Sequence, residues 1–83
     1  MDFSFIPYSN FSPDGKALLT VARMHVKIWC TFSGNCLHTL VGSEFSDAVF
    51  SCDGRSVLTG GSAVSIWNAT TWELEMIFIL SEP

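Results

Sequence analysis

Short apolar stretches alternate with turn-forming residues along the whole chain. Val, Ile, Leu, Phe and Thr gather in short runs, and Gly, Pro, Asp and Ser stand between these runs. This spacing is typical of all-β folds, in which each run forms one strand. The segment 71–80 comes nearest to a helical pattern, but its β-branched and aromatic residues favour a strand.

The pattern predicts eight strands in two groups of four. The first group covers 3–11, 16–22, 25–32 and 36–41, and the second covers 45–50, 55–59, 63–68 and 74–80. Pro7 confines the first strand to an edge or a bulge, because proline has no backbone N–H to donate. Gly60 and Gly61 are predicted to form the hairpin turn between the sixth and seventh strands.

Two segments of the chain are near-copies of two others. Phe-Ser-Pro-Asp-Gly-Lys at 11–16 returns as Phe-Ser-Cys-Asp-Gly-Arg at 50–55, and Val-Lys-Ile-Trp at 26–29 returns as Val-Ser-Ile-Trp at 64–67. The offsets are 39 residues (from 11 to 50) and 38 residues (from 26 to 64). A period near 40 is typical of repeat proteins, whose single units cannot bury their apolar faces alone. We therefore divide the chain into a first unit, 1–41, and a second unit, 42–83.

The repeated motifs resemble those of the WD-repeat family. Both units carry its Phe-Ser-x-Asp-Gly turn and its Val-x-Ile-Trp strand, and together they span nearly the whole chain. The Trp-Asp pair that names the family is degenerate here, as Trp29-Cys30 and Trp67-Asn68, and the Gly-His element before each repeat is eroded. The resemblance implies that each unit is one blade of a β-propeller, a four-stranded antiparallel sheet.

Propellers use about 4 to 8 blades, so two units do not close a ring. The resemblance therefore implies an incomplete propeller, a fragment of a longer array. The alternative is a self-associating structural element, in which several copies complete the ring by edge or face pairing. Apolar residues make up 48% of the chain and charged residues 14%, against about 25% charged in ordinary domains. This excess of apolar surface indicates faces that meet further blades, other copies or a partner.

Residues shared by the two units are expected to build the scaffold. They are Asp14, Gly15 and Trp29 in the first unit, and Asp53, Gly54 and Trp67 in the second. Each aspartate is expected to cap its own turn through Asx-type hydrogen bonds. The resemblance implies that each tryptophan is tied by a hydrogen bond, with Thr20 and Thr59 as the strand hydroxyls. The Asp and His of the family's network are absent, so we expect blades less rigid than consensus blades.

The sequence gives no support to enzymatic or metal chemistry. Cys30, Cys36, His38 and Cys52 include zinc-ligand types, but their spacing does not match a structural zinc loop. An odd number of cysteines does not indicate a disulfide framework, although Cys30 and Cys36 flank a tight turn and are placed to face each other. Nucleophile-elbow and phosphate-loop motifs are absent. We predict no enzyme, no cofactor and no metal; a small hydrolase using His25 and Cys30 is a remote alternative.

Charge and hydropathy restrict the partners further. The net charge is −4, and the four basic residues are scattered rather than clustered, so we predict no nucleic-acid binding. The N-terminus lacks the features of a signal peptide, and the apolar run 76–80 is too short to span a membrane. We expect an intracellular protein, cytoplasmic or nuclear, with reduced thiols and no membrane contact.

The resemblance implies a non-catalytic scaffold that mediates protein–protein interaction or complex assembly. Its partner would meet loops that the rigid blades hold in place. The possible partner-binding residues are Arg23, Met24, His25, Glu44, Phe45 and Asp47 on one rim, with Ser43 and Ser62 beside them, and Trp72 on the opposite rim. Arg, Met and Phe are among the residue types that interface cores enrich. The Trp-Asp-x-Arg motif of ubiquitin-ligase adaptors is absent, which makes that role less favoured.

Overall fold

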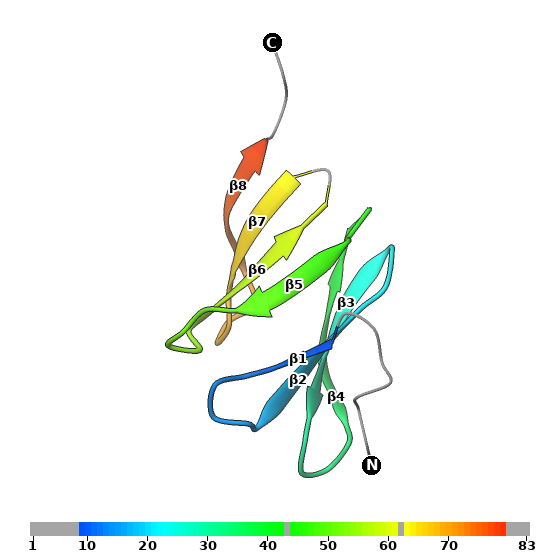
Figure 1. Cartoon of the computed structure of the whole chain (residues 1–83), viewed down its shortest axis with the longest axis vertical. Coiled ribbons are helices and arrows are strands. Elements are labelled where there is room, and N and C mark those ends of the chain that lie inside the picture. The colour runs from blue at the N-terminus through cyan, green and yellow to red at the C-terminus, as the bar shows by residue number, and fades with distance from the viewer. Residues whose placement is uncertain (1–8, 43, 62, 80–83) are drawn as a thin grey trace.

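The computed structural model describes residues 9–42, 44–61 and 63–79, which form two four-stranded antiparallel sheets (Figure 1). The first sheet contains β1 (Ser9–Phe11), β2 (Ala17–Val21), β3 (His25–Cys30) and β4 (Cys36–Val41) in this order. The second contains β5 (Asp47–Phe50), β6 (Ser56–Gly60), β7 (Ala63–Asn68) and β8 (Leu74–Ile79). The fold is all-β, as predicted. No helix long and apolar enough to cross a membrane occurs in the described part of the chain.

The observed strands match the predicted ranges closely. The strands predicted at 36–41 and 63–68 have the observed bounds, and the others from 16 onward differ by at most two residues at either end of their described part. Ser9–Phe11 is the described part of the strand predicted at 3–11, and Pro7 lies outside the described residues. The prediction for Gly60 was wrong. It belongs to β6, because it pairs with Asp47 in the adjacent strand, and the turn begins at Gly61.

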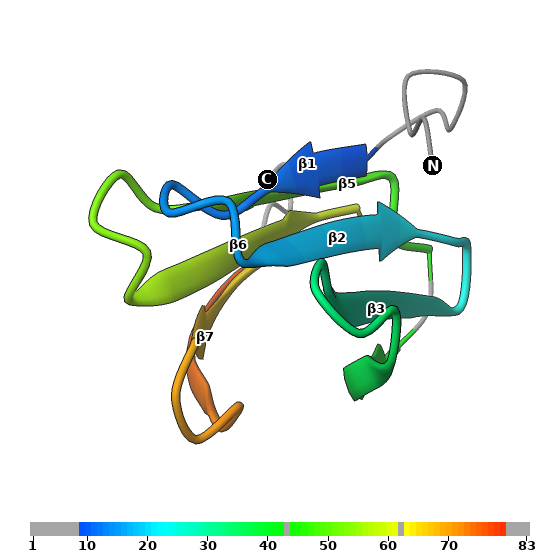
Figure 2. The ribbon, with the colours of Figure 1, turned by 90° about the horizontal axis from the view of Figure 1, so that it is seen from below.

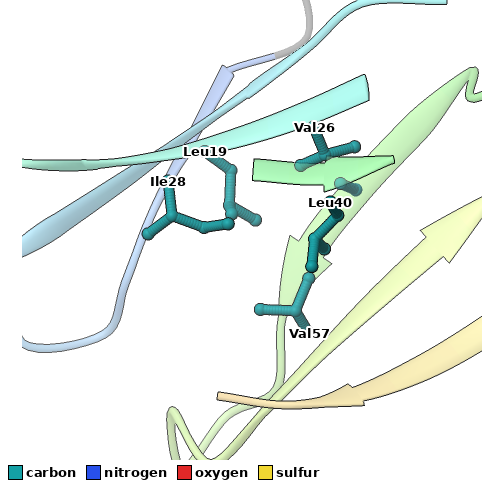
Figure 3. Close-up of a cluster of buried hydrophobic side chains, with 6 residues drawn as sticks. Leu19, Val26, Ile28, Leu40 and Val57 are labelled. Carbon is teal, nitrogen blue, oxygen red and sulfur yellow. The ribbon is translucent and has the colours of Figure 1, made fainter. Parts of the chain in front are cut away.

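A core of aliphatic side chains joins the two sheets. Among the described residues it consists of Leu19, Val26, Ile28 and Leu40 from the first sheet and Ala48 and Val57 from the second. Figure 3 shows the labelled members of this cluster between the strands of the two sheets. β5 is the strand that meets the first sheet, and it lies against β1 and β2 (Figure 2). One face of the first sheet is therefore covered by the second.

The two sheets have matching registers, so their positions can be compared one by one. A row of directly paired residues crosses each sheet. In the first sheet it consists of Asn10, Leu19, Ile28 and His38, and in the second of Val49, Leu58, Ile66 and Met76. An irregularity in register follows this row at the same place in both sheets, after Ile28 and after Ile66. Directly paired residues share a face, so each row lies on one face of its sheet.

Candidate interaction rim

The two Phe-Ser-x-Asp-Gly turns contain the same hydrogen bonds. In the first turn the Ser12 hydroxyl donates to Asp14 Oδ1 at 2.7 Å, and the Lys16 backbone N–H donates to the same oxygen at 2.9 Å. The turn at 50–55 repeats the two bonds at 2.6 and 3.0 Å. This is the geometry of an Asx turn, in which the side chain holds the backbone two residues ahead.

These hydrogen bonds also stabilise the ionised form of each aspartate. The serine hydroxyl, and after it the backbone N–H of Lys16 or Arg55, holds the pKa of Asp14 and of Asp53 below the ordinary value of 3.8. The glycine that follows each aspartate has φ of +74° or +73°, a left-handed conformation that favours glycine. The shared residues therefore shape the turns.

Each sheet also contains one part-buried hydrogen bond between a tryptophan and a threonine. Trp29 Nε1–H donates to Thr20 Oγ1 at 2.8 Å, and Trp67 Nε1–H donates to Thr59 Oγ1 at 3.0 Å. The ammonium of Lys27 lies 5.7 Å from the centre of a Trp29 ring, within cation–π range. No buried side-chain polar atom in the described ranges lacks a hydrogen-bond partner. The threonines thus supply the acceptors that the resemblance implied.

Two loops meet at one rim of the molecule, namely the turn 22–24 and the connection 42–46. The backbone N–H of Phe45 donates to the carbonyl of Arg23 at 2.9 Å, and that of Gly42 donates to the carbonyl of Met24 at 3.1 Å. The Arg23 guanidinium lies 3.8 Å from the Glu44 carboxylate. Because backbone atoms make the joining hydrogen bonds, the side chains of Arg23, Met24 and Glu44 remain in solvent.

The turn between β6 and β7 completes this rim. A Cβ atom at Gly61 would collide with the carbonyl oxygen of Glu44, and the backbone N–H of Ser46 donates to the carbonyl of Gly60 at 3.0 Å. Glu44 has a φ of +64°, a sparsely populated conformation for a residue with a side chain. Ser43 and Ser62, which were predicted to flank this rim, lie outside the described residues. We use the name "rim" for residues 22–24, 42, 44–46 and 61.

Of three further predicted rim residues, Phe45 and His25 are half-buried and Asp47 is exposed. The ring of Phe45 packs against the aliphatic core and so close to Gly42 that an added Cβ would lie 2.7 Å from it. His25 is half-buried as the first residue of β3. The Asp47 carboxylate accepts a hydrogen bond from the Ala48 backbone N–H at 2.8 Å. Phe45 and His25 therefore present less of their side chains to solvent than Arg23, Met24 and Glu44 do.

Trp72 lies away from this rim and joins the two sheets. Its ring stacks on that of His38, with centroids 5.5 Å apart and planes 15° apart. Its backbone N–H donates to the carbonyl of Asn68 at 2.7 Å, and its φ is +62°. The ring also packs against the core. No sequence signal pointed to this stack, because the two rings come from different repeats.

The geometry does not bring His25 and Cys30 together. His25 and Cys30 are the two ends of β3, five residues apart, which corresponds to about 16 Å of extended strand. The hypothesis of a hydrolase built on these two residues fails on this distance. Hydrogen bonds from Ser33 and from the backbone of Phe32 lower the pKa of the Cys30 thiol. In the described ranges no group of three His, Cys, Asp or Glu side chains is placed to hold a metal ion.

The cysteines are free thiols. Cys30, Cys36 and Cys52 form no disulfide, and the Cys36 thiol lies 3.4 Å from the His38 carbonyl oxygen, to which it donates. The Cys30 thiol is instead engaged with Ser33 in the following turn. The two thiols that flank the β3–β4 turn thus have different hydrogen-bond partners.

Comparison with solved structures identifies the two sheets. The chain is similar to the structure of U3-55K and to the crystal structure of RRP9 WD40 repeats, each with a TM-score of 0.79 and 22% sequence identity. The matches cover 86% of this chain in both cases, and 25% and 24% of those two chains. The two sheets are WD-repeat blades. Blade 1 is β1–β4 and blade 2 is β5–β8, with the WD-type turn and tryptophan strand in each.

The WD-repeat blades also have a similar counterpart among curated proteins. The transcriptional corepressor LEUNIG_HOMOLOG of Arabidopsis thaliana is 36% identical over 62 residues, which is 70% of this chain and 8% of the corepressor. The two blades therefore span a small part of this relative and about a quarter of each solved structure. No model of a protein family matches the sequence.

Proposed function

We propose that the chain is a non-catalytic scaffold that binds a protein partner through the rim. The observation that carries this proposal is the pair of backbone hydrogen bonds that joins the turn 22–24 to the connection 42–46. These bonds order the loops in the absence of a partner. The loops therefore lose less conformational entropy when a partner binds. The side chains of Arg23 and Glu44 are 82% and 64% exposed, and Met24 is 58% exposed.

The three exposed side chains indicate what kind of partner surface would bind the rim. Arg23 offers a planar set of donors for a carboxylate or a backbone carbonyl. Glu44 offers an acceptor beside it, 3.8 Å from the guanidinium. Met24 adds a flexible apolar contact of a type found at adaptable binding surfaces. The partner surface would therefore combine an acceptor, a donor and an apolar side chain, and its affinity would decrease with salt.

The comparison with a transcriptional corepressor supports complex assembly as the setting of this role, in the cytoplasm or the nucleus. The scattered basic residues support a protein partner rather than nucleic acid. The distance between His25 and Cys30 supports a role without catalysis.

Site-specific photocrosslinking tests the rim. One variant carries a photoreactive residue at Met24, and a matched variant carries it at Phe32, which is 84% exposed in the turn between β3 and β4. A partner captured at position 24 is then purified, and its affinity is measured for Arg23→Ala, Met24→Asp and Phe32→Asp. We expect the two rim variants to bind at least about tenfold more weakly, as central interface residues do, and Phe32→Asp to bind normally. Equal crosslinking at both positions, or unchanged affinity of the rim variants, would contradict the proposal.

A further inference from the structure

The two blades separate toward their outer strands and leave a cleft between them. β5 packs against blade 1, whereas β7 and β8 diverge from it (Figure 1 and Figure 2). The cleft has a volume of about 210 Å³ and is bounded by Val41 of blade 1 and by Ala63, Ser65, Trp67, Leu74 and Ile77 of blade 2. We use the name "outer cleft" for the space between these side chains.

The blade 2 wall of the outer cleft differs from the same positions of blade 1. In blade 2, Ser65 pairs with Ile77, and both side chains line the cleft. The same register positions in blade 1 are occupied by Lys27 and Thr39. The long charged side chain is thus replaced by a short hydroxyl, and the threonine by an isoleucine that is 50% exposed. Blade 2 therefore has a shorter and more apolar wall at these positions.

The tryptophan of blade 2 faces the outer cleft for the same reason. In blade 1 the ammonium of Lys27 lies 5.7 Å from the centre of a Trp29 ring. Ser65 occupies the equivalent place two residues before Trp67, and its side chain is too short to extend over an indole ring. The Trp67 side chain therefore forms part of the cleft wall, where it offers apolar surface to a bound group.

The outer cleft opens beside the rim. Gly42, Phe45 and Gly61 belong to the rim and also line the cleft. The first two are hydrogen-bonded to the turn 22–24, so a partner seated on that turn lies next to the cleft. A further blade would pack on a face of blade 1 or blade 2, because each repeat contacts only its neighbours, and the cleft lies between two blades that already contact each other. The partner on the rim is therefore the molecule best placed to enter it.

We propose that the outer cleft receives one apolar side chain, the size of leucine or phenylalanine, from the protein partner that binds the rim. This inference rests on the proposed function and names the group that anchors the partner. An apolar cavity of about 150 Å³ already accepts a benzene ring, so the volume of the cleft is sufficient. None of the described residues that line the cleft is charged, so a charged side chain would lose its hydration there without gaining a partner.

Titration with N-acetyl-leucine amide, followed by NMR of the indole N–H groups, tests the outer cleft without a partner. The Trp67 signal should shift in a saturable way, while the Trp29 signal of blade 1 serves as the internal reference. N-acetyl-alanine amide should bind at least about tenfold more weakly, because it buries less apolar surface. N-acetyl-lysine amide should also bind at least about tenfold more weakly, because its charge would be desolvated.

Two neighbouring residues of β8 provide matched variants for this titration. Met76 and Ile77 are 51% and 50% exposed, but their side chains lie on opposite faces of blade 2. Ile77→Asp should weaken the binding of the leucine amide at least about tenfold, because it places a carboxylate in the cleft. Met76→Asp should leave it within about threefold. Ala63→Leu, which fills the cleft with an apolar side chain of the chain itself, should also prevent binding, and circular dichroism checks that each variant is folded.

The partner captured at position 24 separates this inference from the proposed function. It should bind Ile77→Asp at least about tenfold more weakly and Met76→Asp normally. Normal binding of Ile77→Asp together with weakened binding of Arg23→Ala overturns the cleft but leaves the rim. Normal binding of both Ile77→Asp and Arg23→Ala overturns the rim, and this inference with it.

Three results of the amide titration also overturn the inference. The first is equal shifts of the Trp67 and Trp29 signals, which indicate binding without a preference for the cleft. The second is equal binding of the leucine and lysine amides. The third is a Trp67 signal that shifts with protein concentration in the absence of any amide, which indicates that a second copy of the chain fills the cleft.

Discussion

Blade 1 and blade 2 share several apolar residues at equivalent strand positions but bury them differently. Leu19, Val26 and Ile28 in blade 1 are fully buried, while the equivalent Leu58, Val64 and Ile66 are half-buried. The residue types are identical at these three positions. Their burial therefore depends on what packs against the blade, and local sequence decides only that a blade forms. The stability of such a repeat is the sum of the stability of the blade itself and the free energy of its packing against the neighbouring blade.

Truncating the equivalent leucine in each blade should give the largest difference in stability between the two blades. Leu19→Ala removes a fully buried side chain and should lower the free energy of unfolding by about 2–5 kcal/mol. Leu58→Ala should lower the free energy of unfolding by less than about half of this amount. The Leu58 side chain already contacts water, so its removal leaves a smaller cavity. Urea denaturation at concentrations where the chain is monomeric compares the two. Equal losses would mean that the blades do not differ in burial in solution.

Removing the threonine hydroxyl that accepts the hydrogen bond of each tryptophan should give a smaller difference in stability between the blades. Thr59 is 1% exposed and Thr20 is half-buried. Thr59→Val should cost about 1–3 kcal/mol, because the Trp67 N–H then lacks a partner in a dry place. Thr20→Val should cost about 1 kcal/mol, since water can reach the freed Trp29 N–H more easily. Urea denaturation of the two variants measures both losses of unfolding free energy, and hydrogen exchange of the indole N–H groups gives an independent measurement. A larger loss for Thr20→Val than for Thr59→Val would contradict the prediction.

The turn aspartates should show the smallest difference, because their hydrogen bonds are the same in both blades. The pKa of Asp14 and of Asp53 is lowered in the folded chain from 3.8, so each carboxylate stabilises the fold above this value. That contribution is lost as pH falls through the lower, folded pKa.

Urea denaturation as a function of pH measures this contribution. Asp14→Asn and Asp53→Asn should each reduce the acid-induced loss of stability by a similar amount, and the double variant by their sum. A marked inequality between the two single variants would show that the turns are not equivalent in solution. The natural chain and Asp47→Asn serve as references, since the Asp47 carboxylate takes no part in either turn.

The sequence was sufficient for features that depend on neighbours along the chain. Strand ranges and the two Asx turns follow from spacing within a single repeat, and the threonine partners of the tryptophans follow from the family resemblance. Each of these features closes over fewer than ten residues or pairs adjacent strands. Gly60 was misplaced because a glycine pair signals a turn, whereas pairing with Asp47 extends the strand by one residue.

The sequence was not sufficient for features that require both blades. The inward position of Phe45 and the stack of Trp72 on His38 depend on how one sheet lies against the other. Residue type alone indicated exposed contacts for both aromatic residues. The rim was predicted as a set of residues, but its hydrogen bonds between the turn 22–24 and the connection 42–46 come from tertiary packing.

Gly61 limits how the two copies of the repeat can diverge. The backbone oxygen of Glu44 occupies the space that a side chain at position 61 would need. The loop at the corresponding place in blade 1 contains Arg23, whose side chain is 82% exposed beside the Glu44 carboxylate. One member of this duplicated pair can thus vary and acquire recognition chemistry, while the other is restricted to glycine by the connection that passes over it.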